Sequence, residues 1–169
     1  MIKLKRITTR DIASNAIIEA VYVVLTLITY PFSYMGIQFR VAEIMVLLCF
    51  FRKDYAIGLI IGCAIANLAS SIGLVDVGFG TLATLLACLG IMFSKWLAIA
   101  CIFPVVCNAF IVGFELWKFL GLPFWLSVGE VAAGEAAVMI LGYILFMVLK
   151  RRKWFFETVR ANQNIDFKW

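Results

Sequence analysis

The sequence contains no histidine and only three prolines among its 169 residues. Without histidine, the chain has neither a histidine-ligated metal site nor a Ser-His-Asp catalytic triad, and we expect no metal ion and no cofactor. Charged residues make up 15% of the chain, whereas a soluble domain usually has about 25%. Together with 64% apolar residues, this composition excludes an ordinary soluble domain and a disordered chain.

Six apolar segments follow one another and predict an all-α integral membrane protein with six transmembrane helices. One crossing of a bilayer takes about 20 residues, so six helices with short loops fill a single membrane domain, residues 1–169. The second segment is too short to span upright, and we expect it to begin in the preceding loop or to lie buried against its neighbours. The expected helices cover about residues 11–30, 41–51, 55–72, 77–93, 95–118 and 124–149.

Proline and glycine predict where helices break. Pro31 is expected to end the first helix. Pro104 is expected to kink the fifth, because proline has no backbone N–H to donate to the preceding turn. The run Gly121-Leu122-Pro123 predicts the turn into the sixth helix.

Lysine and arginine gather at both ends of the chain and in the loops after the second and fourth segments. Such residues mark the cytoplasmic side of membrane proteins, so both termini, residues 1–10 and 150–169, are expected in the cytoplasm. An even number of helices agrees with this orientation. The net charge of +5 therefore does not indicate nucleic-acid binding. Trp154, Phe155 and Phe156 are expected to form an interfacial anchor after the last helix.

Polar side chains gather where three helical hairpins reach the outer face. A charge at the centre of a membrane helix costs about 2.5–3.5 kcal/mol, so it is tolerated mainly beside a wet cavity or a partner. The inner half holds far fewer such residues, Glu19 being the main one. This asymmetry predicts a pocket that opens outward and is closed below. The outer set is Gln38, Arg40, Glu43, Asn67, Asp76, Glu115, Lys118, Glu130 and Glu135.

Helical periodicity selects among these residues. Asn108 and Glu115 are seven residues apart and therefore lie on one helix face. Glu130 and Glu135 lie about 140° apart around their helix. We favour Glu135 for the site because it lies deeper in the membrane.

Several of these residues also have structural interpretations. Arg40 and Glu43 pair with each other if the turn between them is helical. Asp76 precedes an apolar run, where aspartate often caps a helix. Trp125 and Phe79 suit either ligand stacking or a membrane-interface belt. The five cysteines lie in apolar runs without a Cys-x-x-Cys pair and are interpreted as packing residues.

Small residues recur at every fourth position in three helices, which permits close helix packing in lipid. In the first helix they are Ala16 and Ala20, a ridge that suits packing within the bundle or docking of a partner helix. The chain has no Gly-x-x-x-x-Gly-Lys-Ser/Thr loop, so it does not hydrolyse ATP itself. A small bundle with an outward pocket and no energy source fits a substrate-capturing subunit.

Five spaced segments carry a family resemblance. They are Gln38-Phe39-Arg40-Val41-Ala42-Glu43, Gly62-Cys63 with Ala66-Asn67-Leu68, Asp76 followed by Gly80-Thr81-Leu82-Ala83-Thr84-Leu85-Leu86-Ala87, Asn108-Ala109 with Val112-Gly113, and Gly134-Glu135. Over about residues 12–149 the chain resembles the queuosine-precursor transporter family, QueT. Members of that family are substrate-binding (S) components of energy-coupling factor (ECF) transporters.

The resemblance implies a six-helix S component of an ECF-type ABC importer in the plasma membrane of a prokaryote. It implies capture of a queuosine precursor, a 7-deazaguanine such as the aminomethyl form, from outside. It also implies docking on a transmembrane coupling protein that is bound to two cytoplasmic ATPases. In the wider ECF class an Ala-x-x-x-Ala ridge on the first helix contacts the coupling protein, and Ala16 and Ala20 match that ridge.

The chemistry of 7-deazaguanines agrees with the polar set. Their N1–H and N2–H₂ edge presents two parallel donors that suit a carboxylate, and the aminomethyl cation suits a second one. We therefore expect Glu135 and Glu115 to bind the donor edge and the amine, in either order. Supporting contacts are expected from Gln38, Arg40, Asn67 and Asn108, with Glu43 orienting Arg40.

Two alternatives stay open at the level of sequence. One is an S component for a different purine-like base or vitamin. The other is a membrane protein without a transport function, either a structural protein or a small intramembrane enzyme. The enzyme is disfavoured because the chain has no histidine and no carboxylate pair four residues apart on a helix.

Overall fold

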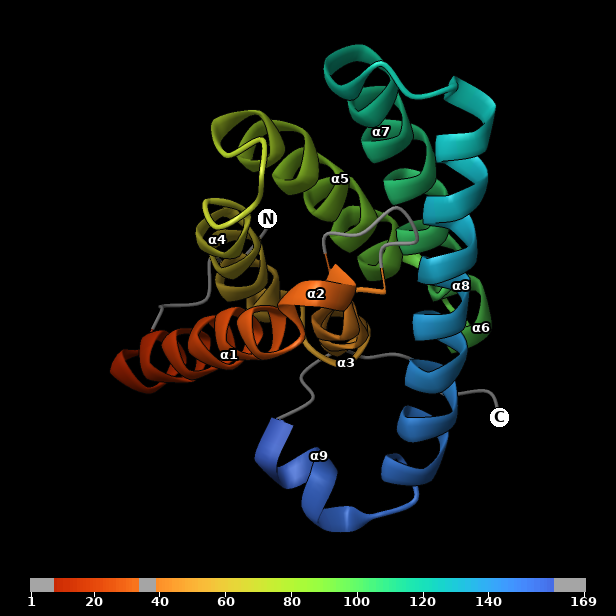
Figure 1. Ribbon diagram of the computed structural model, residues 1–169. Helices are drawn as coiled ribbons and strands as arrows, with labels where there is room; N and C mark the ends of the chain where they lie inside the picture. Colours follow the sequence, from red (N-terminus) through yellow and green to blue (C-terminus); the bar gives the residue numbers. More distant parts are fainter. Residues whose placement is uncertain (1–7, 34–38, 160–169) are drawn as a thin grey trace, which may run out of the picture.

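The computed structural model describes residues 8–33 and 39–159, and all regular structure in these ranges is helical (Figure 1). The elements labelled η are 3₁₀ helices. The elements in chain order are α1 (Thr9–Ile28), α2 (Tyr30–Ser33), η1 (Val41–Leu47), α3 (Leu48–Phe51), η2 (Lys53–Tyr55), α4 (Ala56–Asn67), α5 (Leu74–Phe93), α6 (Leu97–Ala100), α7 (Ile102–Leu120), α8 (Phe124–Leu149) and α9 (Lys153–Val159).

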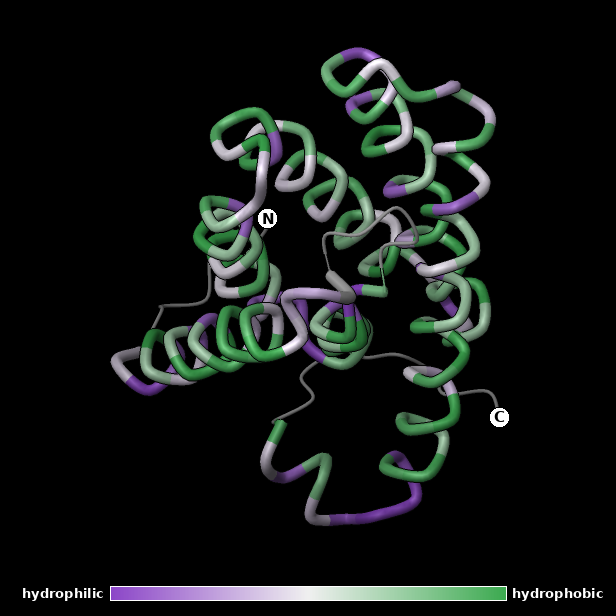
Figure 2. Tube along the Cα trace, viewed as in Figure 1, coloured by the Kyte–Doolittle hydropathy of each residue, from purple (hydrophilic) through white to green (hydrophobic). Residues whose placement is uncertain are grey.

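Four helical segments in the described ranges are long and apolar enough to cross a membrane. The other two predicted spans form shorter helices, η1 with α3 and the 12-residue α4. Figure 2 shows hydrophobic residues along most of the length of the long helices and a hydrophilic turn between α8 and α9. This distribution is that of a protein whose outer helix faces contact lipid. The four segments are Thr9–Ile28, Leu74–Phe93, Leu97–Leu120 and Phe124–Leu149.

The first helix begins and ends earlier than predicted. Thr8 and Asp11 form a capping box, in which the Thr8 side chain accepts from the Asp11 N–H and the Asp11 carboxylate accepts from the Thr8 N–H. At the other end α1 stops at Ile28, and Pro31 lies inside the short α2. Pro31 has no N–H to donate to the Leu27 carbonyl. The series of helical hydrogen bonds therefore stops before Pro31, and α1 ends at Ile28.

The predicted kink at Pro104 corresponds to a short interruption of the helix one turn earlier. The segment expected to form one kinked helix is divided into α6 and α7, with a turn at Cys101. Ala100 is the last residue of α6, and Pro104 has no N–H to donate to its carbonyl. The predicted turn after α7 is confirmed, because Gly121 ends α7 in the left-handed region with φ 69°.

A short buried segment, η1 with α3, lies at the centre of the bundle (Figure 1). η1 packs against α1, α4, α5 and α8. Around this segment the longer helices pack in series, α1 on α4, α4 on α5, α5 on α7 and α7 on α8. Val46, Leu47 and Cys49 have no exposed surface. The expectation that residues 41–51 lie buried against their neighbours is therefore confirmed.

The crossing of α1 and α4 depends on two glycines, Gly58 and Gly62. A Cβ atom on Gly62 would lie 3.1 Å from the Glu19 carbonyl oxygen and 3.2 Å from the Tyr22 Cβ. Gly58 lies closer still, because an added Cβ would be 2.5 Å from the Asn15 carbonyl oxygen. Its N–H donates to Asn15 Oδ1 at 2.9 Å. Small residues thus allow the two backbones to approach closely. Tyr22 of α1 is buried inside the bundle.

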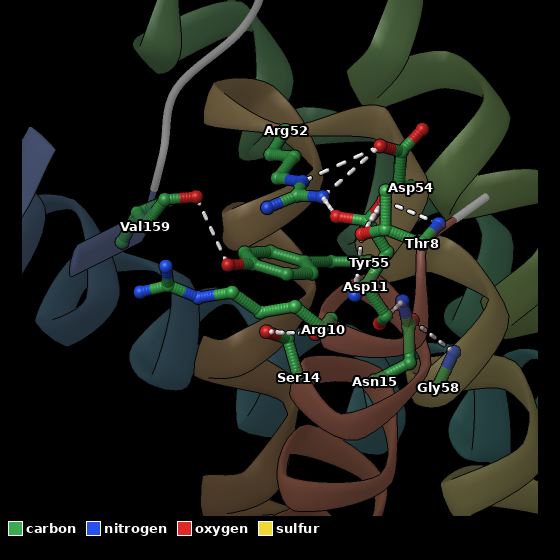
Figure 3. Close-up of polar contacts among 10 residues, drawn as sticks. All are labelled: Thr8, Arg10, Asp11, Ser14, Asn15, Arg52, Asp54, Tyr55, Gly58 and Val159. Atoms are coloured by element: carbon green, nitrogen blue, oxygen red, sulfur yellow. Dashed lines mark hydrogen bonds and ion pairs between the residues drawn. The ribbon is translucent and has the colours of Figure 1, made fainter. Parts of the chain in front are cut away.

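A group of polar contacts joins the start of α1 to the segment after α3, and joins that segment to α9 (Figure 3). The buried Arg52 guanidinium lies 2.5 Å from Asp11 Oδ1 and 3.3 Å from Asp54 Oδ2. The Tyr55 hydroxyl donates to the Val159 carbonyl at 2.9 Å. These contacts hold together three segments that are far apart in the sequence.

The C-terminal aromatic residues do not all act as the predicted interfacial anchor. Phe155 is buried and packs edge-on against Phe51, with ring centroids 5.2 Å apart, and against Phe146 at 5.9 Å. Trp154 is exposed, as an anchor requires. Phe155 is core because α9 folds back onto α3 and α8, which the sequence pattern did not indicate.

Replacing Arg52 is expected to destabilise the fold. Arg52→Ala leaves the Asp11 carboxylate without its guanidinium partner, and we expect the free energy of unfolding to fall. Titration of the purified protein with denaturing detergent measures this loss. Arg151→Ala, at an exposed arginine, is the matched control and is expected to change little. Equal stability of the two variants would contradict the role given to Arg52.

Candidate functional site

Six of the seven predicted binding residues lie in the described part of the chain, and all six are buried. Gln38 lies outside the described residues. The six come from five places in the fold, namely the residue before η1, η1 itself, the end of α4, and the two facing helices α7 and α8. They are Arg40, Glu43, Asn67, Asn108, Glu115 and Glu135.

Close packing of α7 on α8 brings Asn108 and Glu135 together. Gly113 of α7 faces the backbone of α8, where an added Cβ would lie 3.0 Å from the Val128 Cα. The Asn108 amide then donates to Glu135 Oε1 at 2.6 Å. Asn108 and Glu115 are both buried on α7, as their seven-residue spacing predicts.

Arg40 is the cation of this polar group. Its guanidinium lies 4.0 Å from Asp76 Oδ2, and both side chains are 4% exposed. The charge of Arg40 also acts on the carboxyl groups of Glu43, Glu115 and Glu135. One guanidinium therefore connects carboxyl groups from η1, α5, α7 and α8.

Glu43 is held from two sides. Its N–H donates to the Arg40 carbonyl at 2.9 Å, so the two residues form the helical turn that their spacing predicts. Its Oε1 accepts a 2.5 Å hydrogen bond from the hydroxyl of Tyr22, a fully buried residue of α1. Sequence analysis did not identify Tyr22, because one tyrosine within an apolar helix is indistinguishable from a packing residue.

Asp76 belongs to the same group, and its predicted role as a helix cap is wrong. The cap of α5 is Gly73, with φ 52°, and Asp76 is the third residue of the helix. The helix begins earlier because Gly73 adopts a positive φ, which glycine tolerates, and so ends the preceding turn. The Asn67 amide donates to the Asp76 carbonyl at 3.1 Å and to the Cys63 sulfur at 3.4 Å, which joins α4 to α5.

Several buried oxygen atoms of the group have no hydrogen-bond donor within the described part of the chain. A buried acceptor without a donor costs about 1–3 kcal/mol, so this arrangement is unfavourable for stability alone. A ligand that brings N–H groups removes the penalty. The atoms concerned include Asn67 Oδ1, Asp76 Oδ1, both carboxylate oxygens of Glu115 and Glu135 Oε2.

The group is closed in this structure, which corrects the expectation of a pocket open to the outside. None of the six described binding residues is more than 4% exposed. Trp125 is 74% exposed and belongs to the outer surface. Phe79 packs against Phe114 and Phe119, with ring centroids 5.9 and 5.7 Å away. These ring contacts join the beginning of α5 to the end of α7.

Comparison with known proteins identifies the family. A family model described as QueT transporter matches residues 12–151. The chain belongs to the QueT transporter family. A queuosine precursor transporter QueT of Lactococcus lactis subsp. cremoris (strain MG1363) is 33% identical over 167 residues, which covers 88% of this chain and 97% of that protein. No solved structure matches the chain.

Membership of the QueT family confirms the resemblance found in the sequence and, together with the apolar helices, indicates a membrane transport protein. The family match contains the whole buried polar group, from Tyr22 to Glu135. It ends before α9, so the helix that packs on α3 and α8 lies beyond the matched region.

Two glycines of α5 provide a test of the Asn67–Asp76 contact. A methyl group on Gly80 would collide with the Asn67 amide and approach Asp76 Oδ1, whereas nothing lies within 4 Å of one on Gly78. Both Gly→Ala changes gain the same helix propensity. We expect Gly80→Ala to be about 1–3 kcal/mol less stable than Gly78→Ala, measured by detergent-induced unfolding. Indistinguishable variants would show that Asn67 moves aside freely.

Proposed function

We propose that this protein is the S component of an ECF-type ABC importer and captures a queuosine precursor from outside the cell. The observation that carries the proposal is the set of buried oxygens that lack donors, together with one guanidinium among four carboxyl groups. Such a set suits a ligand rich in N–H donors and positive charge. The relative of this chain carries the name queuosine precursor transporter, which agrees with such a ligand.

A 7-deazaguanine with an aminomethyl group has the matching chemistry. Its base edge presents N1–H and N2–H₂ as parallel donors, and its side chain is an ammonium group at neutral pH. Charge-assisted hydrogen bonds to carboxylates are the strong ones in a buried site. The ligand supplies donors for oxygen atoms that the protein does not satisfy itself.

We assign Glu135 to the base edge and Glu115 to the ammonium group. Asn108 fixes the orientation of the Glu135 carboxylate and leaves Oε2 available, which suits recognition of a directional edge. Both oxygens of Glu115 are available, and Asp76 acts on the same region from α5. Two carboxyl groups on facing helices suit three ammonium protons. Asn67 and Arg40 support the ligand, and Glu43 orients Arg40.

The proposed partner surface is the outer face of α1. In the candidate span Thr9–Ile28 only 17% of the residues are buried, compared with 39% in each of the other three spans. Ala16 and Ala20 are exposed on this helix. We propose that this ridge docks on the transmembrane coupling protein, which is bound to two cytoplasmic ATPases, in a prokaryotic plasma membrane with both termini inside.

The substrate assignment predicts that Glu135→Gln loses binding. An amide places an N–H₂ group against the ligand's own donors, and we expect affinity for 7-aminomethyl- and 7-cyano-7-deazaguanine to fall about 100-fold. Calorimetry on the purified protein in detergent measures both. Glu130→Gln, at a partly exposed residue one turn and a half earlier on α8, is the matched control and retains binding. Binding of another purine-like base or vitamin, but of no deazaguanine, would replace the substrate and leave the transport class in place.

The partner assignment predicts that bulky substitutions on α1 separate binding from transport. We expect Ala16→Trp with Ala20→Trp to retain substrate affinity, because both residues face outward, and to reduce cellular uptake at least about tenfold by blocking close helix contact. Co-purification of the coupling protein is measured in parallel. Ile144→Trp, on the exposed face of α8, is the control. Normal uptake by the double variant would exclude this face as the docking surface.

A further inference from the structure

The buried polar group has an imbalance of charge. Glu43, Asp76, Glu115 and Glu135 are each at most 4% exposed. Among the described residues, the guanidinium that acts on all four is that of Arg40. If all were ionised, four negative charges would face one positive charge inside an apolar bundle. A buried charge without a counter-charge is strongly unfavourable, and a carboxyl group in that position holds a proton instead. In the absence of ligand, some of these groups are therefore protonated.

Glu115 is the carboxyl group with the least support from the protein. Glu43 accepts a hydrogen bond from Tyr22, and Glu135 accepts one from Asn108. Neither oxygen of Glu115 accepts a hydrogen bond within the described part of the chain. No hydrogen bond there offsets the loss of hydration that an ionised Glu115 suffers.

The charged groups around Glu115 do not compensate for this. Asp76 faces it from α5 and repels its ionised form, while Arg40 attracts it but lies among the other carboxyl groups as well. From α8, Glu135 is acidic and pairs with Asn108, and Glu130 is partly exposed. Lys118 of α7 is exposed one turn further along. The nearest groups thus leave Glu115 without a cation of its own.

We infer that the ammonium group of the substrate takes the place of a proton at Glu115. The inference rests on the proposed function, which assigns an aminomethyl deazaguanine to this group. The ammonium enters protonated, the Glu115 carboxyl loses its proton to the solvent, and the resulting carboxylate accepts from the ammonium N–H groups together with Asp76 Oδ1. No other bond forms or breaks. Charge inside the bundle is then unchanged by binding, which avoids burying an additional net charge.

A neutral analogue separates this exchange from recognition of the base. 7-Cyano-7-deazaguanine has the same donor edge but no cation. Its binding therefore does not stabilise the ionised form of Glu115. Proton release is therefore expected from the aminomethyl form and not from the cyano form. The sign follows from mass action, because a reaction that releases a proton is favoured as pH rises.

Calorimetry of the full chain in buffers of different ionisation enthalpy tests the inference. At pH 7 we expect the aminomethyl form to release about one proton more than the cyano form. Between about pH 5 and 7 its affinity is expected to rise about tenfold per pH unit, while that of the cyano form stays constant. Equal binding heats for the aminomethyl form in every buffer would overturn the inference.

Variants assign the proton to a residue. Glu115→Gln is expected to abolish the proton release and to weaken the aminomethyl form about 10- to 100-fold, with the cyano form changed less than about threefold. Glu130→Gln is expected to retain both affinities and the proton release. Unchanged proton release in Glu115→Gln would overturn the assignment. Absence of binding by every deazaguanine to the folded protein is a different result, which would overturn the proposed substrate.

Discussion

Arg40 is buried at the start of the central segment of an apolar bundle, and the arrangement of the other polar groups follows from this constraint. A guanidinium is strongly unfavourable in such an interior unless acids surround it. Asp76 Oδ2 lies 4.0 Å away, and Glu43, Glu115 and Glu135 are within its electrostatic reach. Because these acids come from α5, η1, α7 and α8, burying one arginine requires four elements to meet at one place.

The central segment has an arginine at each end, and the two are satisfied differently. Arg52 lies 2.5 Å from Asp11 and 3.3 Å from Asp54, and its guanidinium also lies over the Tyr55 ring, 4.9 Å from the centroid. Arg40 is 4.0 Å from Asp76, and buried acceptors remain unsatisfied around it. The ion pairs of Arg52 join segments that are far apart in the sequence and stabilise the fold, whereas the unsatisfied acceptors near Arg40 leave hydrogen bonds that a ligand can complete.

Sequence pattern predicts the long helices of this fold better than the short ones. Residues 124–149 form one helix as expected, and the breaks at Pro104 and Gly121 follow from local backbone chemistry. The 3₁₀ geometry of Val41–Leu47 and the early end of α4 at Asn67 depend on packing between distant segments, which periodicity does not encode. Charged and amide residues are rare in membrane helices, so their positions in the sequence are informative. Six of the seven residues selected in this way are buried in the structure. Tyr22, whose partner Glu43 is 21 residues away, carried no such signal.

α1 connects the candidate binding site with the proposed docking surface. Its inner side contacts α4 through Gly58 and Gly62 and reaches the polar group through Tyr22, while Ala16 and Ala20 face outward. The bond from Tyr22 to Glu43 is the contact through which a change in the charge or position of the polar group reaches α1 directly. A helix with few buried residues moves at lower cost than one enclosed by neighbours, because fewer packed side chains must separate. The span with the smallest share of buried residues is thus also the one that contacts the candidate site on one side and carries the exposed Ala16 and Ala20 on the other.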